Sequence, residues 1–582
     1  MDKESELIQR FVPVTIHSKK LISHLGKEMQ SAIFEMIEAS KYANNIFLEQ
    51  VSHDGVGAIE KVEKELQESK KSGNETQQKL LERRLHLLHL FAGPYGKPDG
   101  VNFLPGETGT IPPEAGFYPK GTTKEDIDKY VAAHPERKED ILAIDTVVER
   151  DGENDFKAIK FSERYERWVT PLCNHLDKAA EILRITEPEF SHFIEARSHA
   201  LRTNTNLYDT DIEWMRLPSK CPVDLVIGPI ETYEDQIEGM KGSYQSIVFV
   251  RADNEMQKLE EFKKLMNKME RNIPLKEEYL REKRVDGPLA GASSSASSGS
   301  SEPETRIELY NVVYLGGDAA APTYVVAHNL PNDERITSRF GNRNQFYLNI
   351  LQTKAEKILV PISNVVIGEA FRKYVSYDGF FMHVLMHELS HTLGPSFVRN
   401  DGVTTIKSAL QDLYSTIEEC KADVLSSIFA KCIVDGRLYR SDGCKEGEGE
   451  AKKEENSKER QKLITEEELK SIHVTSLASM FRSIRFGHES AHAKGCIIQL
   501  NWLIAHGAAK PGPSGFEVDF AKCDEAFWLL GKELLEIKVE GDRDRAERLL
   551  KEYGTDLPDY AQHYLDLLRP LPIDLAVSFD LD

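Results

Sequence analysis

Two histidines four residues apart, with a glutamate directly after the first, are the residues of this chain that most clearly point to chemistry. His387, Glu388 and His391 form the segment HELSH inside a helix-like apolar pattern that Gly394-Pro395 would end. Four residues span slightly more than one helical turn, so both imidazoles project from one face and can share one ion. Zinc there would lower the pKa of a bound water to about 7, and Glu388 would take its proton as general base.

A second histidine pair complicates the choice of ligands. His383 also stands four residues before His387. Val384 follows it, however, at the position where the base would be needed. We therefore predict that His387 and His391 bind the metal and that His383 is a packed residue or one that supports the ligands from behind.

A third protein ligand is required, and a second predicted helix can supply it. Apolar residues recur at helical spacing through residues 408–434, around the motif EECKAD. Glu419 is the predicted metal ligand. Asp423, four residues later, and Glu418 are predicted to accept hydrogen bonds from ring nitrogens of the ligand histidines. The alternative is that EECKAD is only a solvated charged face.

With these residues in place, the chain resembles the dipeptidyl-peptidase III family of zinc exopeptidases. It is most similar to the shorter bacterial members and to the peptidase-like half of plant proteins that also carry a Nudix domain. The resemblance covers most of the chain, through the segments PPEAGFYPKGTTKED, IGPIETYED, GGDAAAPTYVVAHNLPNDERI, EKILVPI, HELSH, EECKAD and ESAHAKG. It implies one zinc ion per chain, an oligopeptide substrate and the release of dipeptides from the N-terminus of that substrate.

The resemblance also implies roles for residues outside the zinc motifs. Glu231 would bind the free ammonium of the substrate, and Tyr233 would donate a hydrogen bond to the scissile carbonyl. Asn329 and Asn332 would hold the N-terminal part of the peptide, and His492 would stabilise the oxyanion. Taken singly, each has a simpler interpretation as a sheet-edge, turn, core or surface residue. Their joint occurrence in family order favours the functional one.

Two departures from the family leave alternatives open. The better-known members carry HExxxH, whereas this chain has the shorter HExxH, and AKGCIIQLN follows His492 in place of an Arg-bearing continuation. The placement of Glu388 relative to substrate therefore stays open. The alternatives are a zinc peptidase with another cleavage register and a non-catalytic metalloprotein of the same fold that binds peptides or a partner.

The composition predicts a globular protein of more than one lobe. A chain of 582 residues is too long for one core. Asp and Glu number 96 against 74 Lys and Arg, a formal charge of -22 without a basic stripe, so nucleic acid is a poor candidate partner. No run reaches the roughly 20 apolar residues of a membrane span, and no signal peptide is recognisable. Seven scattered Cys predict reduced thiols, and we expect a cytoplasmic protein of unknown oligomeric state.

These elements fit the α+β fold that the resemblance implies: a mainly helical zinc-binding lobe and a mixed lobe with a β-barrel-like sheet, separated by a wide cleft. Helices are predicted through residues 20–92 and from about 356 to 550, and strands between 223 and 335. The predicted divisions are 1–251 (mixed lobe with a helical N-terminal segment), 252–312 (helical lobe, with a flexible linker at 287–304), 313–358 (mixed-lobe strands), 359–555 (catalytic helical lobe, with an exposed charged run at 444–462) and 556–582 (return to the mixed lobe).

Overall fold

The computed structural model describes residues 3–97, 100–105, 109–152, 155–205, 207–276, 279, 306–322, 326–391, 393–395, 397–399, 404–439, 463–485 and 490–581. The predicted linker 287–304 and charged run 444–462 lie outside these residues. The chain divides into two compact units. Unit 1 comprises Met1–Asp253, Ser301–Ile350 and Pro572–Asp582, and unit 2 comprises Asn254–Ser300 and Leu351–Leu571. The predicted two-lobed α+β fold is confirmed.

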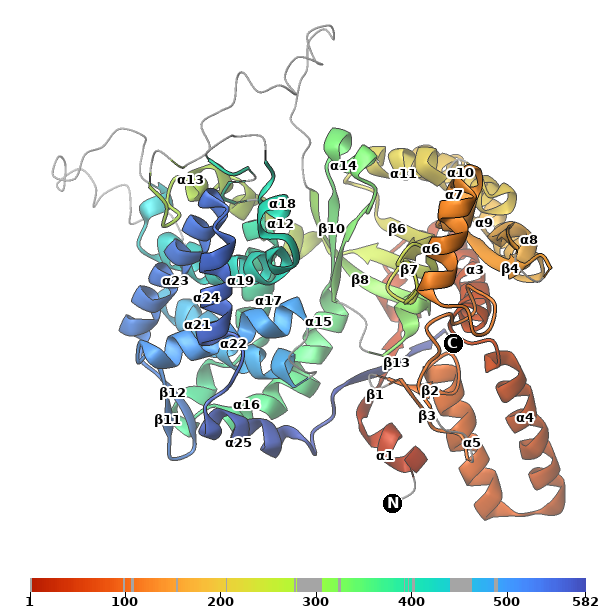
Figure 1. Cartoon of the computed structure of the whole chain (residues 1–582), viewed down its shortest axis with the longest axis horizontal. Helices are drawn as coiled ribbons and strands as arrows, with labels where there is room; N and C mark the ends of the chain where they lie inside the picture. The colour runs from red at the N-terminus through yellow and green to blue at the C-terminus, as the bar shows by residue number, and fades with distance from the viewer. Residues whose placement is uncertain are drawn as a thin grey trace, which may run out of the picture. The chain divides into compact units, whose positions relative to one another are not determined.

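Unit 1 is built on a five-stranded mixed sheet (Figure 1). The strand order is β6-β7-β8-β10-β9, antiparallel except for the parallel pair β8–β10. β6 and β7 are rich in β-branched residues and buried along nearly their whole length, as expected for strands covered on both faces. The bounds are β6 Val223–Glu231, β7 Ser243–Arg251, β8 Arg306–Gly317, β9 Ala327–Leu330 and β10 Arg343–Tyr347.

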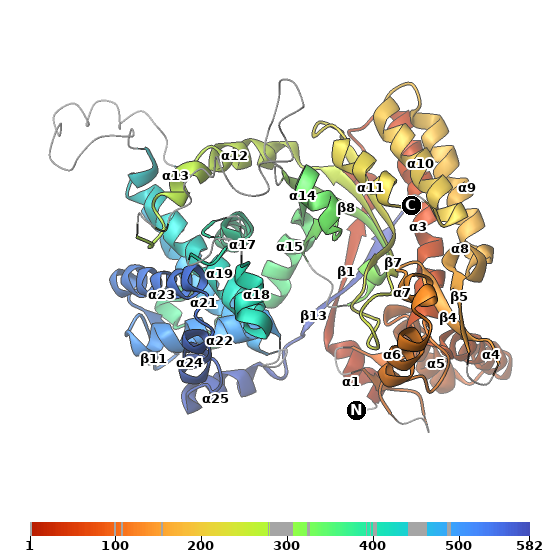
Figure 2. The same ribbon diagram turned by 45° about the horizontal axis from the view of Figure 1, so that its top comes forward.

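Helices cover this sheet. α3 packs on β7 and β8 and also on α9, and α9 packs on α10; Figure 2 shows these three helices side by side. The amphipathic α9 turns Leu172, Leu176 and Leu183 inward, each fully buried, which fixes its packing. The helices of unit 1 are α1 Lys3–Gln9, α2 Ser18–Ile22, α3 Lys27–Val51, α4 Gly55–Ser72, α5 Glu75–Leu90, α6 Lys124–Ala133, α7 Lys138–Leu142, α8 Phe161–Arg164, α9 Glu166–Leu183, α10 Pro188–Thr203, α11 Leu207–Arg216 and α14 Glu334–Phe340.

Smaller strand pairs complete unit 1. The two ends of the chain meet in one of them, because β1 (Phe11–His17) pairs in parallel with β13 (Asp574–Asp580). The others are antiparallel: β2 (Tyr95–Gly96) with β3 (Val101–Asn102), and β4 (Thr146–Arg150) with β5 (Phe156–Lys160).

Unit 2 is mainly helical, and α19 lies at its centre, with α17, α21, α22 and α23 packed against it. The residues of α19 are almost all buried from Thr416 to Val434, which explains its apolar sequence. The helices are α12 Asp253–Lys263, α13 Met266–Glu270, α15 Leu348–Lys354, α16 Val360–Val366, α17 Tyr377–His391, α18 Ile406–Leu410, α19 Tyr414–Val434, α21 Glu466–Ile484, α22 Ala491–Ala505, α23 Phe520–Glu540, α24 Arg543–Tyr553 and α25 Asp559–Leu568.

The prediction that residues from about 356 to 550, apart from the charged run, have a helical pattern is wrong at one hairpin. A hairpin of β11 (Ala509–Gly512) and β12 (Gly515–Val518) lies between α22 and α23. Its turn consists of Pro513 and Ser514, and Gly515, which begins β12, has a φ of 134°, a region that favours glycine. Among the described residues, no helix is long and apolar enough to cross a membrane.

Candidate metal centre

The histidine pair lies at the end of α17. His387 is buried, and Glu388 and His391 are partly exposed. α17 ends at His391, and Gly394 follows with a φ of 84°, which suits glycine after a helix. Gly379 lets the start of the helix approach α21, because a Cβ there would lie 2.4 Å from the Ser471 hydroxyl. The pair is therefore held on a helix fixed by packing.

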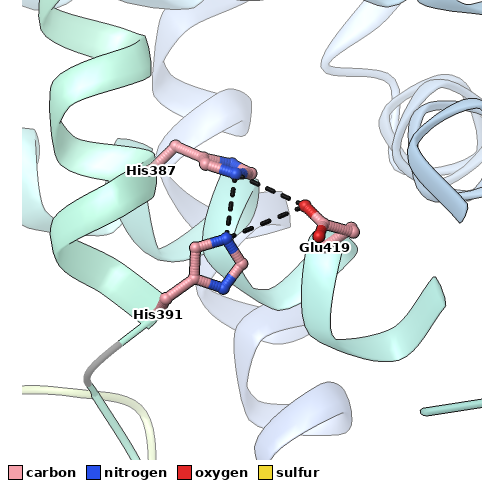
Figure 3. A group of neighbouring side chains, drawn as sticks. All are labelled: His387, His391 and Glu419. Carbon is pink, nitrogen blue, oxygen red and sulfur yellow. Dashed lines mark hydrogen bonds and ion pairs between the residues drawn. The ribbon is translucent and has the colours of Figure 1, made fainter. Parts of the chain in front are cut away.

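α19 brings Glu419 to the same point (Figure 3). The Nε2 atoms of His387 and His391 lie 3.1 Å apart. Glu419 Oε2 lies 3.4 Å from His387 Nε2 and 3.8 Å from His391 Nε2. Tetrahedral zinc, with bonds of about 2.0–2.2 Å, separates its ligand atoms by about 3.3–3.6 Å. The spacing of these three atoms suits one metal ion.

The hydrogen bonds behind the histidines also fit a metal. His387 Nδ1 lies 2.7 Å from Asp423 Oδ1, and His391 Nδ1 lies 3.0 Å from Glu418 Oε1. Ionised carboxylates only accept, so each Nδ1 donates, and each Nε2 offers a lone pair to a metal once it has lost any proton that it carries. Glu419 Oε2 is buried and has no hydrogen-bond partner in the part of the chain that the structure describes. A cation satisfies all three atoms at once.

The charges around His387 favour a cation as well. Burial opposes a charge on the imidazole, yet Asp423 and Glu419 hold the pKa of His387 well above its ordinary value. The positive charge of His387 in turn overcomes burial and keeps the pKa of Asp423 well below its usual range. The same negative field that attracts a proton to His387 attracts a metal ion.

Two lysines that sequence reasoning missed support Glu418. Lys421, fully buried, donates to the carbonyls of Ser390 and Leu393 at the end of α17 and lies 2.7 Å from Glu418 Oε1. Lys538 on α23 donates to Glu418 Oε2. Despite burial, Lys421, His391 and Lys538 hold the pKa of Glu418 well below its usual range. Lys421 lies inside EECKAD, but nothing local marks Lys538.

The Asp423 side of the centre has supports of its own. Gln499 on α22 donates to Asp423 Oδ2 at 2.9 Å. His383 is buried beside this carboxylate, with its Nε2 3.5 Å from Asp423 Oδ1 and its Nδ1 2.9 Å from the Ser426 hydroxyl. His383 thus lies behind the ligand pair, and its burial lowers its pKa.

His492 lies beside the side chains of His387, His391 and Glu419. It lies in the first turn of α22, whose N-cap Ser490 accepts from Ala493 N–H. Its side chain is 64% exposed, and its Nδ1 lies 3.1 Å from Glu419 Oε2. His492 therefore presents an accessible imidazole next to the candidate metal site.

In unit 1, the curled sheet brings two more predicted site residues together. Glu231 ends β6, and Asn332 follows β9; these are the two edge strands. In a flat five-stranded sheet, edge strands lie about 19 Å apart. Asn332 Nδ2 nevertheless donates to Glu231 Oε2 at 3.1 Å. The sheet must therefore curl like part of a barrel, and a register shift between Pro229 and Glu231 accompanies the curl.

A cavity of about 580 Å³ adjoins this pair. Glu231, Tyr233 and Asn332 all line it, and Tyr233 is 82% exposed. Burial raises the pKa of Glu231. The hydrogen bond from Asn332 opposes this shift, and the negative charge of Asp318 adds a smaller increase. Asn329 is an exposed residue of β9, and it is not among the described residues that line this cavity.

Comparisons with known proteins cover nearly the whole chain. Nudix hydrolase 3 of Arabidopsis thaliana is 28% identical over 619 residues, which cover 99% of this chain and 73% of that protein. The structure of DPP III from Caldithrix abyssi has a TM-score of 0.84 at 28% identity and covers 99% of both chains. Dipeptidyl-peptidase III from Corallococcus sp. strain EGB has a TM-score of 0.73 at 29% identity, covering 99% of this chain and 96% of its own. No protein-family model matches the chain.

Proposed function

We propose that this chain, which belongs to the dipeptidyl-peptidase III family, is a zinc-dependent exopeptidase that releases dipeptides from the N-terminus of oligopeptides. The observation that carries the proposal is the convergence of His387, His391 and Glu419 on one point, with Glu388 next to the first histidine. Two histidines and one acid, with a neighbouring base, are the residues that metal-assisted hydrolysis requires.

Unit 2 would carry out the chemical step. Zinc bound by His387, His391 and Glu419 would supply Lewis acidity, which polarises a carbonyl and lowers the pKa of water to about 7. Glu388 would accept the proton of the attacking water and pass it to the leaving amine. The accessible imidazole of His492 would donate to the oxygen on which negative charge develops. Asp423 and Glu418 would keep both ligand histidines in the required tautomer.

Unit 1 would hold the substrate. Glu231 and Asn332, hydrogen-bonded to each other, would bind the ammonium of the peptide. Asn329 would contact the backbone of the first residues of the peptide. Tyr233 would donate to the scissile carbonyl. Capture of the ammonium fixes the distance from the N-terminus to the cleaved bond, so it would select the second peptide bond.

The cavity beside Glu231 indicates which N-terminal side chain would fit. Apolar and aromatic residues supply much of its lining, among them Phe193, Trp214, Ile230 and Pro331. A side chain next to the bound ammonium would remove this surface from water. We therefore expect peptides that begin with a large apolar residue to have a lower KM than peptides that begin with glycine.

The test is mass spectrometry of an unblocked octapeptide incubated with zinc-loaded protein. We expect a dipeptide and a hexapeptide as the first fragments, and no cleavage of the same peptide after N-acetylation, because acetylation removes the ammonium. First cleavage at an internal bond, or equal cleavage of the acetylated peptide, would rule out the dipeptidyl register. Absence of any hydrolysis with bound zinc would rule out the peptidase proposal.

A further inference from the structure

A second cavity of about 540 Å³ lies in unit 2, further along α19. Its lining includes Ser427, eight residues after Glu419 and therefore about 12 Å along the helix. None of the residues assigned to the candidate metal centre lines it. The cavity is a separate feature of the same helical unit.

The lining contains buried polar atoms without partners. His473 on α21 is 4% exposed, and neither of its ring nitrogens has a hydrogen-bond partner among the described residues. The same holds for the Ser427 hydroxyl, which is 1% exposed, and for Asp524 Oδ1 on α23. Buried polar groups are nearly always hydrogen-bonded, and an orphan costs about 1–3 kcal/mol. Three such groups in one cavity indicate a partner other than the residues that the structure describes.

The distances suit a single ligand atom. His473 Nε2 and Asp524 Oδ1 lie 3.8 Å apart, too far for a direct hydrogen bond. One ligand nitrogen between them can reach both at about 2.9 Å. Burial lowers the pKa of His473 to about 4, so its ring is neutral at pH 7 and offers one acceptor nitrogen. A donor that carries positive charge, such as an ammonium, matches this acceptor and the carboxylate.

The charges of the lining favour a ligand that carries both signs. Lys431 and Arg437 provide two cations, both ion-paired with Asp435 behind them, and Asp524 and Glu525 provide two acids. Lys431 Nζ lies 3.7 Å from Asp524 Oδ2, and Arg437 lies over the ring of Trp528. Two cations disfavour a bare metal ion, and two acids disfavour a simple anion. Phe527 and Trp528 add aromatic surface for an apolar group.

We propose that this cavity binds a small zwitterion, an α-amino acid or a dipeptide, with its ammonium between His473, Asp524 and Ser427. Its carboxylate lies toward Lys431 and Arg437, and its side chain packs on the aromatic wall. This site is distinct from the one that holds a peptide for hydrolysis, and it does not require the chain to be a peptidase.

Isothermal titration of the zinc-loaded full chain tests the proposal with three related probes. L-phenylalanine carries both charges, phenethylamine lacks the carboxylate, and 3-phenylpropionate lacks the ammonium. We expect L-phenylalanine to bind and each analogue to bind about 10- to 100-fold more weakly, because each loses one set of charged hydrogen bonds. No heat up to about 10 mM L-phenylalanine overturns the proposal. Equal binding of phenethylamine overturns the role of the two cations.

Variants locate the binding. Asp524→Asn keeps the size of the side chain and should lower the affinity for L-phenylalanine about tenfold or more. We expect the same decrease in affinity for His473→Leu. Exposed Asp544→Asn is the matched control, and Glu231→Gln removes the ammonium ligand proposed in unit 1; both should keep the wild-type affinity. If Glu231→Gln abolishes binding while Asp524→Asn does not, the amino acid binds in unit 1 and the proposal is wrong.

A last comparison identifies the natural source of the ligand. Phe-Ala is titrated into the Glu388→Gln variant next to L-phenylalanine. Tighter binding of the dipeptide, lost in Asp524→Asn, assigns the cavity to peptide products, and tighter binding of the amino acid assigns it to free amino acids. Thermal unfolding shows whether each variant is folded. If His473→Leu does not fold, Asp524→Asn alone tests the location of the binding site.

Discussion

Glu388 is partly exposed and follows His387 directly on α17, and it is not one of the three residues that could hold the metal. Replacement by glutamine keeps the shape and removes the basic carboxylate. We expect Glu388→Gln to keep wild-type zinc content and to lose turnover by about 10²- to 10⁴-fold. Metal analysis and single-turnover hydrolysis of the octapeptide measure the two quantities. Hydrolysis at the wild-type rate would remove Glu388 from its proposed role.

A second prediction concerns the binding of substrate by Glu231. Its carboxylate is bonded to Asn332 and borders a cavity, as an ammonium site requires. We expect Glu231→Gln to raise KM for unblocked peptides about 10-fold or more, because a charged hydrogen bond is worth about 1.5–3 kcal/mol. The variant should leave zinc affinity unchanged. Glu260→Gln, at an exposed position of α12, is a matched control and should keep the wild-type KM.

At the scale of elements, α23 reaches the metal centre through Lys538. This buried lysine holds Glu418, and Glu418 accepts from His391 Nδ1. Loss of groups that orient metal ligands lowers metal affinity about 10- to 100-fold. We expect this decrease for Lys538→Met in competition with a chelator, and partial recovery for Lys538→Arg.

The control for Lys538 lies on the same helix. Lys532 is largely exposed and lies 4.0 Å from Glu536. Lys532→Met should keep the wild-type zinc affinity, since exposed ion pairs contribute little. Thermal unfolding of the metal-free variants separates loss of fold from loss of metal affinity. Unchanged zinc affinity in a folded Lys538→Met protein would show that Lys538 does not position His391.

The sheet of unit 1 depends on a buried ionic group. Arg343 on β10 is 2% exposed and donates to Asp224 on β6 and Glu308 on β8. Removing one partner of such a group leaves uncompensated buried charge. We expect Arg343→Met to lower the free energy of unfolding by about 3–5 kcal/mol, measured by urea denaturation. Exposed Arg339→Met should change it by less than about 0.5 kcal/mol; an equally small effect at Arg343 would contradict the prediction.

At the scale of the whole molecule, unit 1 is assembled from three separate stretches of chain, and the last stretch contributes β13. β13 pairs with β1 over seven residues and buries Leu575. A chain that ends at residue 571 leaves the edge of β1 that pairs with β13 without a partner strand. We expect its thermal midpoint in calorimetry to fall by about 5 °C or more, while a chain that ends at residue 580 keeps the wild-type value. Equal midpoints would show that β13 is dispensable.

The sequence alone determined what local periodicity controls. The four-residue spacing of His387 and His391 requires a shared face once a helix forms, and the apolar positions of 408–434 require a buried helix. The β-branched runs after Val223 predicted β6 and β7, and these strands are confirmed. The two-lobed α+β fold followed from the family motifs, since composition and length indicate only more than one lobe.

The tertiary structure alone decided what lies far apart in the chain. Lys538 reaches Glu418 across 120 residues, and Asn332 reaches Glu231 across 101. Neither contact can be recognised from the neighbouring sequence. A buried lysine and a surface lysine cannot be told apart in a sequence, and the distance between two edge strands depends on how far a sheet curls. Periodicity reports which face of an element is buried; which side chains meet depends on the packing of whole elements.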